Sequence, residues 1–204
     1  IGNTRMSIMI PAWVDGVLTP VEKLEAHQRG LKHKAVSVFM LRDGHVLLQQ
    51  RALEKYHTPG LWANTCCTHP HWEEDSLTCA QRRVPEELGI AAGALDFRGT
   101  VEYRANVGNG LIEHEVVDIF VSYAPDGLEP KPNPAEVMAT RWAPLAGLAE
   151  DVTANAPAYT PWLQLYLREH SAAILGETVQ PRIFALGRHG RPRLSQTPTN
   201  LYMP

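Results

Sequence analysis

The feature that most constrains the fold is an alternation of apolar side chains in the first quarter of the chain. In "HKAVSVFMLRDGHVLLQQRA", apolar positions alternate from Ala35 to Leu41, Asp43-Gly44 follows, and a second extended run covers 46–50. Side chains of a strand alternate between its two faces, and an Asp-Gly pair between two such runs is typical of a hairpin. The sequence therefore predicts an antiparallel hairpin here.

Further strands and two helices follow along the chain. "GTVEYRANVGNGLIEHEVVDIFVSY" predicts two strands joined by the turn "NVGNG", and "EVMATRWAPL" predicts another strand. "TPWLQLYLREHSAAIL" predicts a helix, because Thr160 can cap it and Pro161 suits the first helical position. Strands outnumber helices and the helices come late or between strands. This order predicts a mixed α+β domain, a mixed β-sheet flanked by helices, rather than a doubly wound sheet.

The other predicted helix lies in "EEDSLTCAQRRVPEELGI". Apolar side chains recur there at helical spacing, Asp75 or Ser76 can cap its start, and Gly89 is a stop signal. Pro85 lies inside this helix, where a proline removes a hydrogen bond and costs about 3 kcal/mol. We therefore expect a kink or an early end.

The 204 residues, 44% of them hydrophobic, suffice for one globular domain. We expect a single domain over 6–176, preceded by a short extension at 1–5 ("IGNTR") because Met6 can be a natural start. Residues 177–204 are rich in Pro, Gly, Arg and Gln without periodicity, which predicts a loosely ordered tail.

Charge and targeting signals restrict the class of protein. The net charge is −3 and the basic residues are scattered, so neither a nucleic acid nor a membrane surface is an expected partner. No apolar run is long enough to span a bilayer, and the first 20 residues lack the order of a signal peptide. We predict a cytoplasmic protein, either monomer or homodimer.

The stretch "NTCCTHPHW" has two adjacent cysteines close to a histidine. A disulfide, a metal knuckle, or one working thiol beside a passive one are the alternatives. The chain has only three cysteines, an odd number that argues against a disulfide framework. If the stretch is extended, Cys67 and His69 share one face, and Cys66 lies on the other, where it packs.

A second polar group lies in "GLIEHEVV". On a strand, Glu113 and Glu115 share one face and His114 takes the other. A solvated polar face explains such a pair, but the apolar flanks indicate a strand near the core. A histidine and two glutamates are plausible ligands of a divalent ion such as manganese, zinc or magnesium. His27 and His33 lie upstream, without the tight spacing of a zinc site.

Several basic residues are candidates for an anion site, because a phosphate needs several converging donors. For any one of them a solvated surface position is the simpler explanation, and Arg83 and Glu87 are spaced as a helical ion pair. The candidates are Lys23, Arg51, Lys55, Arg82 and Arg83.

The stretch from Thr68 to Ile90 resembles the Nudix signature, a loop and helix whose glutamates bind magnesium against a diphosphate. Two positions depart from it: Thr68 stands in place of a glycine, and Arg83 in place of a glutamate that a hydrolase uses as a metal ligand. The positions that agree are Glu74, Arg82, Glu86, Glu87, Gly89 and Ile90.

In both departures the chain resembles the type I isopentenyl-diphosphate delta-isomerase family, in particular its bacterial members. The resemblance also covers "EKLEAHQRGLKH", "RALEKYHTPGLWANTCCTHP", "RRVPEELGI", "EYRANVGNGLIEHEVVDIF" and "TPWLQ". It implies a Nudix-like core over about 32–166. Glu73 departs from it, because a glycine is expected there.

The resemblance implies a role for each matching residue. Cys67, Glu115 and Tyr103 would be the catalytic acid/base set. One divalent ion, manganese or zinc, would bind His27, His33, His69, Glu113 and Glu115. A magnesium ion carried with the substrate diphosphate would meet Glu87 and the carbonyl of Cys67. The implied substrate contacts are Lys23, Arg51, Lys55, Arg83 and Trp162.

The implied activity is interconversion of isopentenyl and dimethylallyl diphosphate, which supplies isoprenoid and carotenoid precursors. Protonation and deprotonation of the alkene would pass through a tertiary cation. Two alternatives remain open from the sequence: a Nudix pyrophosphatase, which Arg83 argues against, and a non-catalytic diphosphate sensor, which has no use for Cys67, Tyr103 and Glu115 together.

Overall fold

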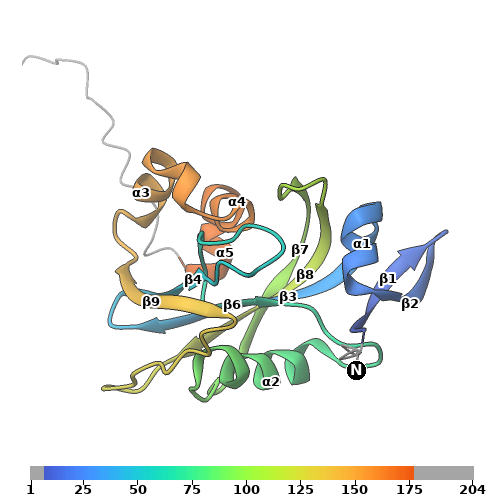
Figure 1. The fold of residues 1–204 in the computed structure, drawn as a ribbon. Helices are drawn as coiled ribbons and strands as arrows, with labels where there is room; N and C mark the ends of the chain where they lie inside the picture. The colour runs from blue at the N-terminus through green and yellow to red at the C-terminus, as the bar shows by residue number, and fades with distance from the viewer. Residues whose placement is uncertain (1–6, 177–204) are drawn as a thin grey trace, which may run out of the picture.

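The computed structural model describes residues 7–176 (Figure 1). The expected extension at 1–5 and tail at 177–204 lie outside the described residues. The strands are β1 (Met9–Val14), β2 (Val17–Glu22), β3 (Lys32–Arg42), β4 (His45–Arg51), β5 (Trp62–Ala63), β6 (Cys66–Thr68), β7 (Asp96–Asn106), β8 (Ile112–Tyr123) and β9 (Val137–Pro144). The helices are α1 (Lys23–Arg29), α2 (Ser76–Leu88), α3 (Leu148–Ala154), the 3₁₀ turn η1 (Ala156–Ala158), α4 (Pro161–Glu169) and α5 (Ser171–Leu175).

Strand β3 is the centre of one mixed sheet. It runs parallel to β8 from Lys32 to Leu41 and antiparallel to β4, β6 and a short stretch of β1. β7 pairs with β8, and β9 pairs with β4. Figure 1 shows α2 below this sheet and α3, α4 and α5 on its other side. The predicted α+β fold is confirmed, as are the β3–β4 hairpin, the β7–β8 hairpin, β9, α2 and α4.

Each face of the sheet carries its own apolar cluster. Cys66, Cys79, Val84 and Leu88 belong to the cluster under α2, whereas the cluster on the other face includes Trp162 and residues of α3 to α5. Side chains of β3 alternate between the two, as the period of a strand requires. No helix among the described residues is long and apolar enough to span a membrane.

Helix α2 corrects one expectation, because it does not end early at Pro85. The helix continues to Leu88, and the Gly89 amide donates to the Pro85 carbonyl with Gly89 in the left-handed region at φ 64°. The last turn is held from outside: the amides of Lys131 and Asn133 donate to the carbonyls of Leu88 and Glu87. Asp75 caps the start, accepting from the Thr78 amide.

The hairpin formed by β1 and β2 and the helix α1 were not predicted from the sequence. β1 and β2 each contain a proline, and Pro11 stands opposite Pro20 in their register. Because proline cannot donate to a strand ladder, it weakens a strand prediction. α1 has only seven residues, too few for a clear helical period. It nevertheless brings His27 to the end of β3, where the site lies.

Candidate active site

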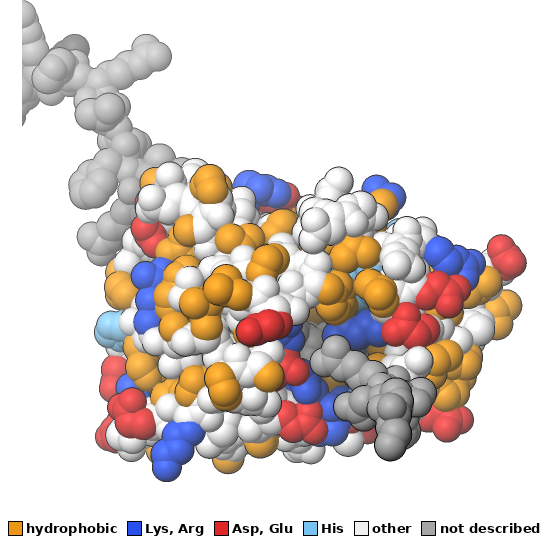
Figure 2. Space-filling view, viewed as in Figure 1, with side chains coloured by type: hydrophobic (Ala, Val, Ile, Leu, Met, Phe, Trp, Pro, Cys, Tyr) orange, Lys and Arg blue, Asp and Glu red, His pale blue; other side chains and the backbone are white. Residues whose placement is uncertain are grey.

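Most of the predicted site residues line one pocket, at one end of β3, β6 and β8. On the face drawn in Figure 2, Lys and Arg side chains lie beside acidic ones near the middle of the molecule. His27 and His33 are not in the pocket wall; their rings pack against that of His69, with centroids 5.1 Å from it in both cases. The predicted residues that line the pocket are Lys23, Arg51, Lys55, Cys67, His69, Arg83, Glu87, Tyr103, Glu113, Glu115 and Trp162.

The two cysteines of β6 face opposite ways, as the strand period predicted. Cys66 is fully buried in the cluster under α2, whereas Cys67 lines the pocket. The Cys67 thiol donates to Asn64 Oδ1 at 2.9 Å and lies 3.6 Å from Ser37 Oγ. Burial raises the pKa of Cys67 to about 12, so the thiol stays protonated near neutral pH. Both cysteines and Cys79 are free thiols, which excludes the disulfide.

Two buried histidines have their tautomers fixed by backbone carbonyls. His27 Nδ1 donates to the Lys23 carbonyl and His33 Nδ1 to the Leu31 carbonyl, each at 2.7 Å. A neutral imidazole has one N–H, so both Nε2 atoms carry lone pairs. Neither Nε2 has a hydrogen-bond partner. A ring held by a carbonyl at one nitrogen and free at the other is typical of a metal ligand.

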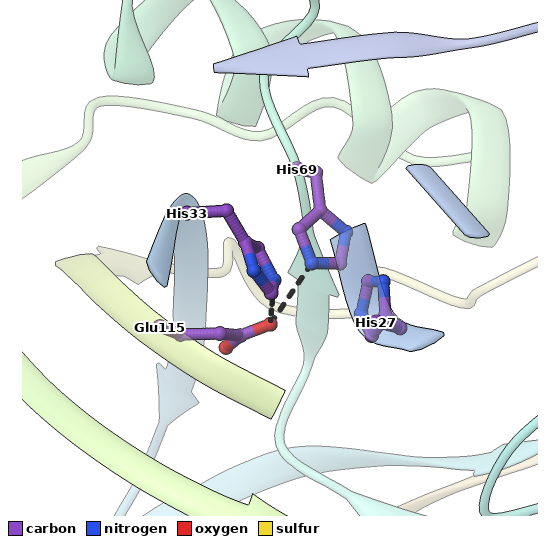
Figure 3. A group of neighbouring side chains, drawn as sticks. All are labelled: His27, His33, His69 and Glu115. Carbon is purple, nitrogen blue, oxygen red and sulfur yellow. Dashed lines mark hydrogen bonds and ion pairs between the residues drawn. The ribbon is translucent and has the colours of Figure 1, made fainter. Parts of the chain in front are cut away.

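Glu115 completes this group (Figure 3). Its Oε1 lies 2.9 Å from His69 Nε2 and 3.5 Å from His33 Nε2. Ligand atoms of His27, His33, His69 and Glu115 all lie within 4.8 Å of one another. Since the His33 lone pair faces a carboxylate oxygen, a cation between them relieves a repulsion. The group therefore fits a divalent metal.

The pKa values of His27 and Glu115 also fit metal binding. Burial lowers the pKa of His27 to about 4, which keeps the ring neutral and able to ligate. Burial alone raises the pKa of a carboxyl group, but the neighbouring imidazole rings of His33 and His69 outweigh it and hold the pKa of Glu115 well below its ordinary value. Glu115 is therefore an anion, as a metal ligand must be.

Tyr103 joins the two glutamates of β8. Its hydroxyl oxygen lies 2.7 Å from Glu113 Oε2 and 2.7 Å from Glu115 Oε2. A phenol has one proton to donate, so one of the two carboxyl groups must itself carry a proton. Burial, and then Glu115, raises the pKa of Glu113 well above its ordinary value. The three side chains thus form a proton-sharing chain beside the pocket.

Four of the basic residues predicted for an anion site lie together in the pocket, beside acidic side chains. Burial, followed by the charges of Lys55, Arg83 and Arg51, lowers the pKa of Lys23 to about 8, as expected where cations converge. Arg83 donates to Glu87 at 2.7 Å and lies 3.5 Å from Glu136, which also pairs with Lys55. Glu87 is buried, so its pair with Arg83 is not a surface ion pair.

Arg82, the remaining candidate for the anion site, instead binds Glu74 in the loop that precedes α2. It does not line the pocket, and it donates to both oxygens of Glu74, at 2.7 and 2.8 Å. Glu74 in turn accepts from the His71 amide at 2.8 Å. Glu73 between them adopts φ 67°, the left-handed conformation that favours a glycine. The departure noted at Glu73 therefore places a strained residue in this loop.

Sequence reasoning missed several polar residues in the pocket or next to it. Ser37 lies on an apolar strand, where the pattern gave it no chemical role, and its hydroxyl lies 3.0 Å from Tyr166 Oη. Gln49 donates to Glu87 Oε2 at 2.9 Å from the neighbouring strand. Tyr56 and His57 lie in an irregular loop without periodicity. His57, His27 and Glu113 form a second group of close ligand atoms.

The model of the NUDIX domain matches residues 31–163. Two solved structures share the fold at low identity. A Deinococcus radiodurans protein has a TM-score of 0.60 and 13% identity, covering 78% of this chain and 97% of its own. The MutT protein of Methanosarcina mazei Go1 has a TM-score of 0.53 and 17% identity, covering 66% and 89%.

Relatives with much higher identity carry a more specific name. The isopentenyl-diphosphate Delta-isomerase of Jannaschia sp. (strain CCS1) is 64% identical over 169 residues, which is 83% of this chain and 96% of that protein. The Rhodobacter capsulatus protein of the same name is 60% identical over 162 residues, 79% and 92% of the two chains. The chain therefore belongs to the NUDIX domain family and, within it, to the isopentenyl-diphosphate Delta-isomerases.

Proposed function

We propose that this protein interconverts isopentenyl diphosphate and dimethylallyl diphosphate. The observation that carries the proposal is one pocket lined by a protonated thiol, a phenol shared between two carboxyl groups, and several cations. The identity to proteins of that name supports the same activity. A proton must be added at one alkene carbon and another removed from the neighbouring carbon, and the pocket has proton-carrying groups for both.

The proton chemistry is assigned to Cys67 on one side of the substrate and to Glu115 with Tyr103 on the other. Tyr103 links Glu115 to Glu113 through two hydrogen bonds of 2.7 Å, so a proton lost by one group is replaced along the chain. The Cys67 thiol, with its pKa raised to about 12 by burial, carries a proton that it would donate to the alkene carbon on its side, and the carboxylate of Glu115 would accept the proton that leaves the neighbouring carbon. General acid–base groups of this kind contribute about 10²- to 10⁴-fold.

The intermediate positive charge needs protection from water. Trp162 is 2% exposed and lines the pocket, and the face of an indole ring stabilises a cation. Arg51 also lies near this ring, 5.3 Å from its centroid. The guanidinium is held in place because it donates to the backbone carbonyls of His57 and Thr58, and the diphosphate end of the substrate would lie beside it.

Two metal ions are part of the proposal. Manganese or zinc would be held by His27, His33, His69, Glu113 and Glu115, and would fix Glu115 and tune its acidity. Magnesium would enter with the diphosphate, near Glu87 and the Cys67 carbonyl, and would neutralise phosphate charge. Lys23, Arg51, Lys55 and Arg83 would supply the remaining donors to the diphosphate.

The test is incubation of the purified protein with isopentenyl diphosphate and Mg²⁺, followed by acid treatment. Dimethylallyl diphosphate is acid-labile, so the expected result is acid-labile product without release of inorganic phosphate. Phosphate release would assign the pocket to a hydrolase. Tight binding with neither product would assign it to a sensor.

A further inference from the structure

His57 is a buried histidine of the pocket without a role in the proposed reaction. It is 4% exposed, and its ring stacks on His27 with centroids 5.4 Å apart and an interplanar angle of 24°. The edge of the ring packs against Trp162 at 6.1 Å. His57 Nε2 points to Glu113 Oε1, 3.5 Å away. Only a specific interaction explains a polar ring placed so deeply.

The backbone around His57 is held by hydrogen bonds from Arg51 and is strained at Thr58. Arg51 Nη2 donates to the His57 carbonyl at 3.1 Å, and Arg51 Nε donates to the Thr58 carbonyl at 3.2 Å. Thr58 adopts φ 46°, a region that a β-branched residue rarely enters. Such strain persists where the surroundings fix the chain, and it clusters at functional sites. The strain and the hydrogen bonds from Arg51 therefore indicate that the position of His57 has a function.

The neighbours of Nδ1 decide which ring nitrogen carries the proton. His57 Nδ1 lies 3.1 Å from the Thr58 hydroxyl and 3.5 Å from Arg51 Nη2. A guanidinium nitrogen can only donate and a hydroxyl can donate, so Nδ1 accepts and Nε2 carries the hydrogen. This is the reverse of His27 and His33, whose Nδ1 atoms face carbonyl oxygens.

This tautomer excludes a second ion at the group formed by His27, His57 and Glu113. A protonated Nε2 cannot bind a metal, and His27 has one free nitrogen, which the first group uses. The geometry points instead to a positioning role: we propose that His57 donates from Nε2 to Glu113 Oε1 and holds that carboxylate for the metal site. The contact of 3.5 Å shortens with a small rotation, as contacts in ligand-free sites commonly do.

The proposed donation fixes the second oxygen of Glu113. Tyr103 already holds Oε2 at 2.7 Å, so with His57 on Oε1 the carboxylate cannot turn. Partners that orient a metal ligand typically contribute 10- to 100-fold in metal affinity. The inference rests on the metal site of the proposed function, but metal binding can be measured without substrate.

The test is titration of the full-length protein with Mn²⁺, with free Mn²⁺ followed by electron paramagnetic resonance. His57→Gln keeps an N–H donor near the position of Nε2, whereas the shorter His57→Asn does not reach it and His57→Leu has none. We expect Gln to stay within about threefold of the unaltered protein, and Asn and Leu to bind about tenfold more weakly or worse. His45→Leu, at the β3–β4 turn and outside the pocket, is the control and leaves the affinity unchanged.

Equal losses in the Gln and Asn variants would overturn the proposal, since a direct ligand or a packing residue loses with both. Unchanged affinity in all three variants would overturn it as well. The comparison of Gln with Asn decides the matter even where the Leu variant does not fold. A protein that shows this pattern in the titration but no isomerisation would refute the proposed function and leave the role of His57 intact.

Discussion

Replacing Tyr103 with phenylalanine removes the single oxygen atom that two buried carboxyl groups share. Tyr103 is 5% exposed, and its hydroxyl oxygen lies 2.7 Å from both Glu113 and Glu115. Phenylalanine keeps the ring, which packs edge-on against Tyr166 at 6.2 Å, so the apolar contacts remain. The variant therefore isolates the polar part of the interaction.

The magnitude follows from the partners left behind. A buried polar group without its hydrogen-bond partner costs about 1–3 kcal/mol, and the change affects two carboxyl groups, of which Glu115 retains His69. We expect the metal-free protein to lose about 2–4 kcal/mol. For a chain of this size that corresponds to a decrease in Tm of roughly 5–15 °C. Isomerisation should fall by about 10²-fold or more, because a link in the proton-sharing chain is lost.

The assay is thermal unfolding by calorimetry, with and without Mn²⁺, alongside the rate of isomerisation. Mn²⁺ should reduce the difference in Tm, because an ion satisfies part of the carboxylate charge. Tyr123→Phe is a matched control, since Tyr123 is 61% exposed and its hydroxyl contacts only Arg98 among the described residues. If the two variants lose the same stability, the reasoning about the shared oxygen is wrong.

Other variants test separate parts of the structure. Cys67→Ala should abolish isomerisation and Cys66→Ala should leave most of it, measured as kcat; equal losses would contradict the assignment of faces. Glu87→Gln should raise the magnesium concentration needed for half-maximal rate, and an unchanged requirement would count against its role. The pKa of Glu74 is lowered by its hydrogen bonds from Arg82, so its stabilisation exists above the ordinary carboxyl pKa and is lost as the pH falls; Glu74→Gln should flatten the acid side of the Tm profile. Glu73→Gly should leave activity unchanged and raise stability by about 0.5 kcal/mol, as relief of left-handed strain exceeds the added chain entropy; a lower Tm would show that the Glu73 side chain matters more than its backbone.

The period of two along a strand predicted much of this site. It separated Cys67 from Cys66 and grouped Glu113 with Glu115, and the structure agrees in each case. Such a period is local, so neighbouring residues suffice to read it. The ends of α2 were predictable for the same reason, since Asp75 and Gly89 act within one turn of the helix.

What the sequence did not predict depends on contacts between distant segments. The last turn of α2, which contains Pro85, accepts hydrogen bonds from the amides of Lys131 and Asn133, about 45 residues further on. Glu136 was not singled out at all, although it pairs with both Lys55 and Arg83. His57 lies in a loop whose conformation depends on the guanidinium of Arg51. No local pattern contains such information.

Arg83 connects these contacts to the difference between a hydrolase and an isomerase. Where the Nudix signature has a metal-binding glutamate, Arg83 donates to Glu87 at 2.7 Å and neighbours Glu136 at 3.5 Å. A carboxylate in its place would repel both and favour an additional cation that activates water. In the proposed function the arginine would instead supply a donor for the diphosphate. In the proposed function the diphosphate would stay intact, and the chemistry would fall to the proton carriers Cys67 and Tyr103.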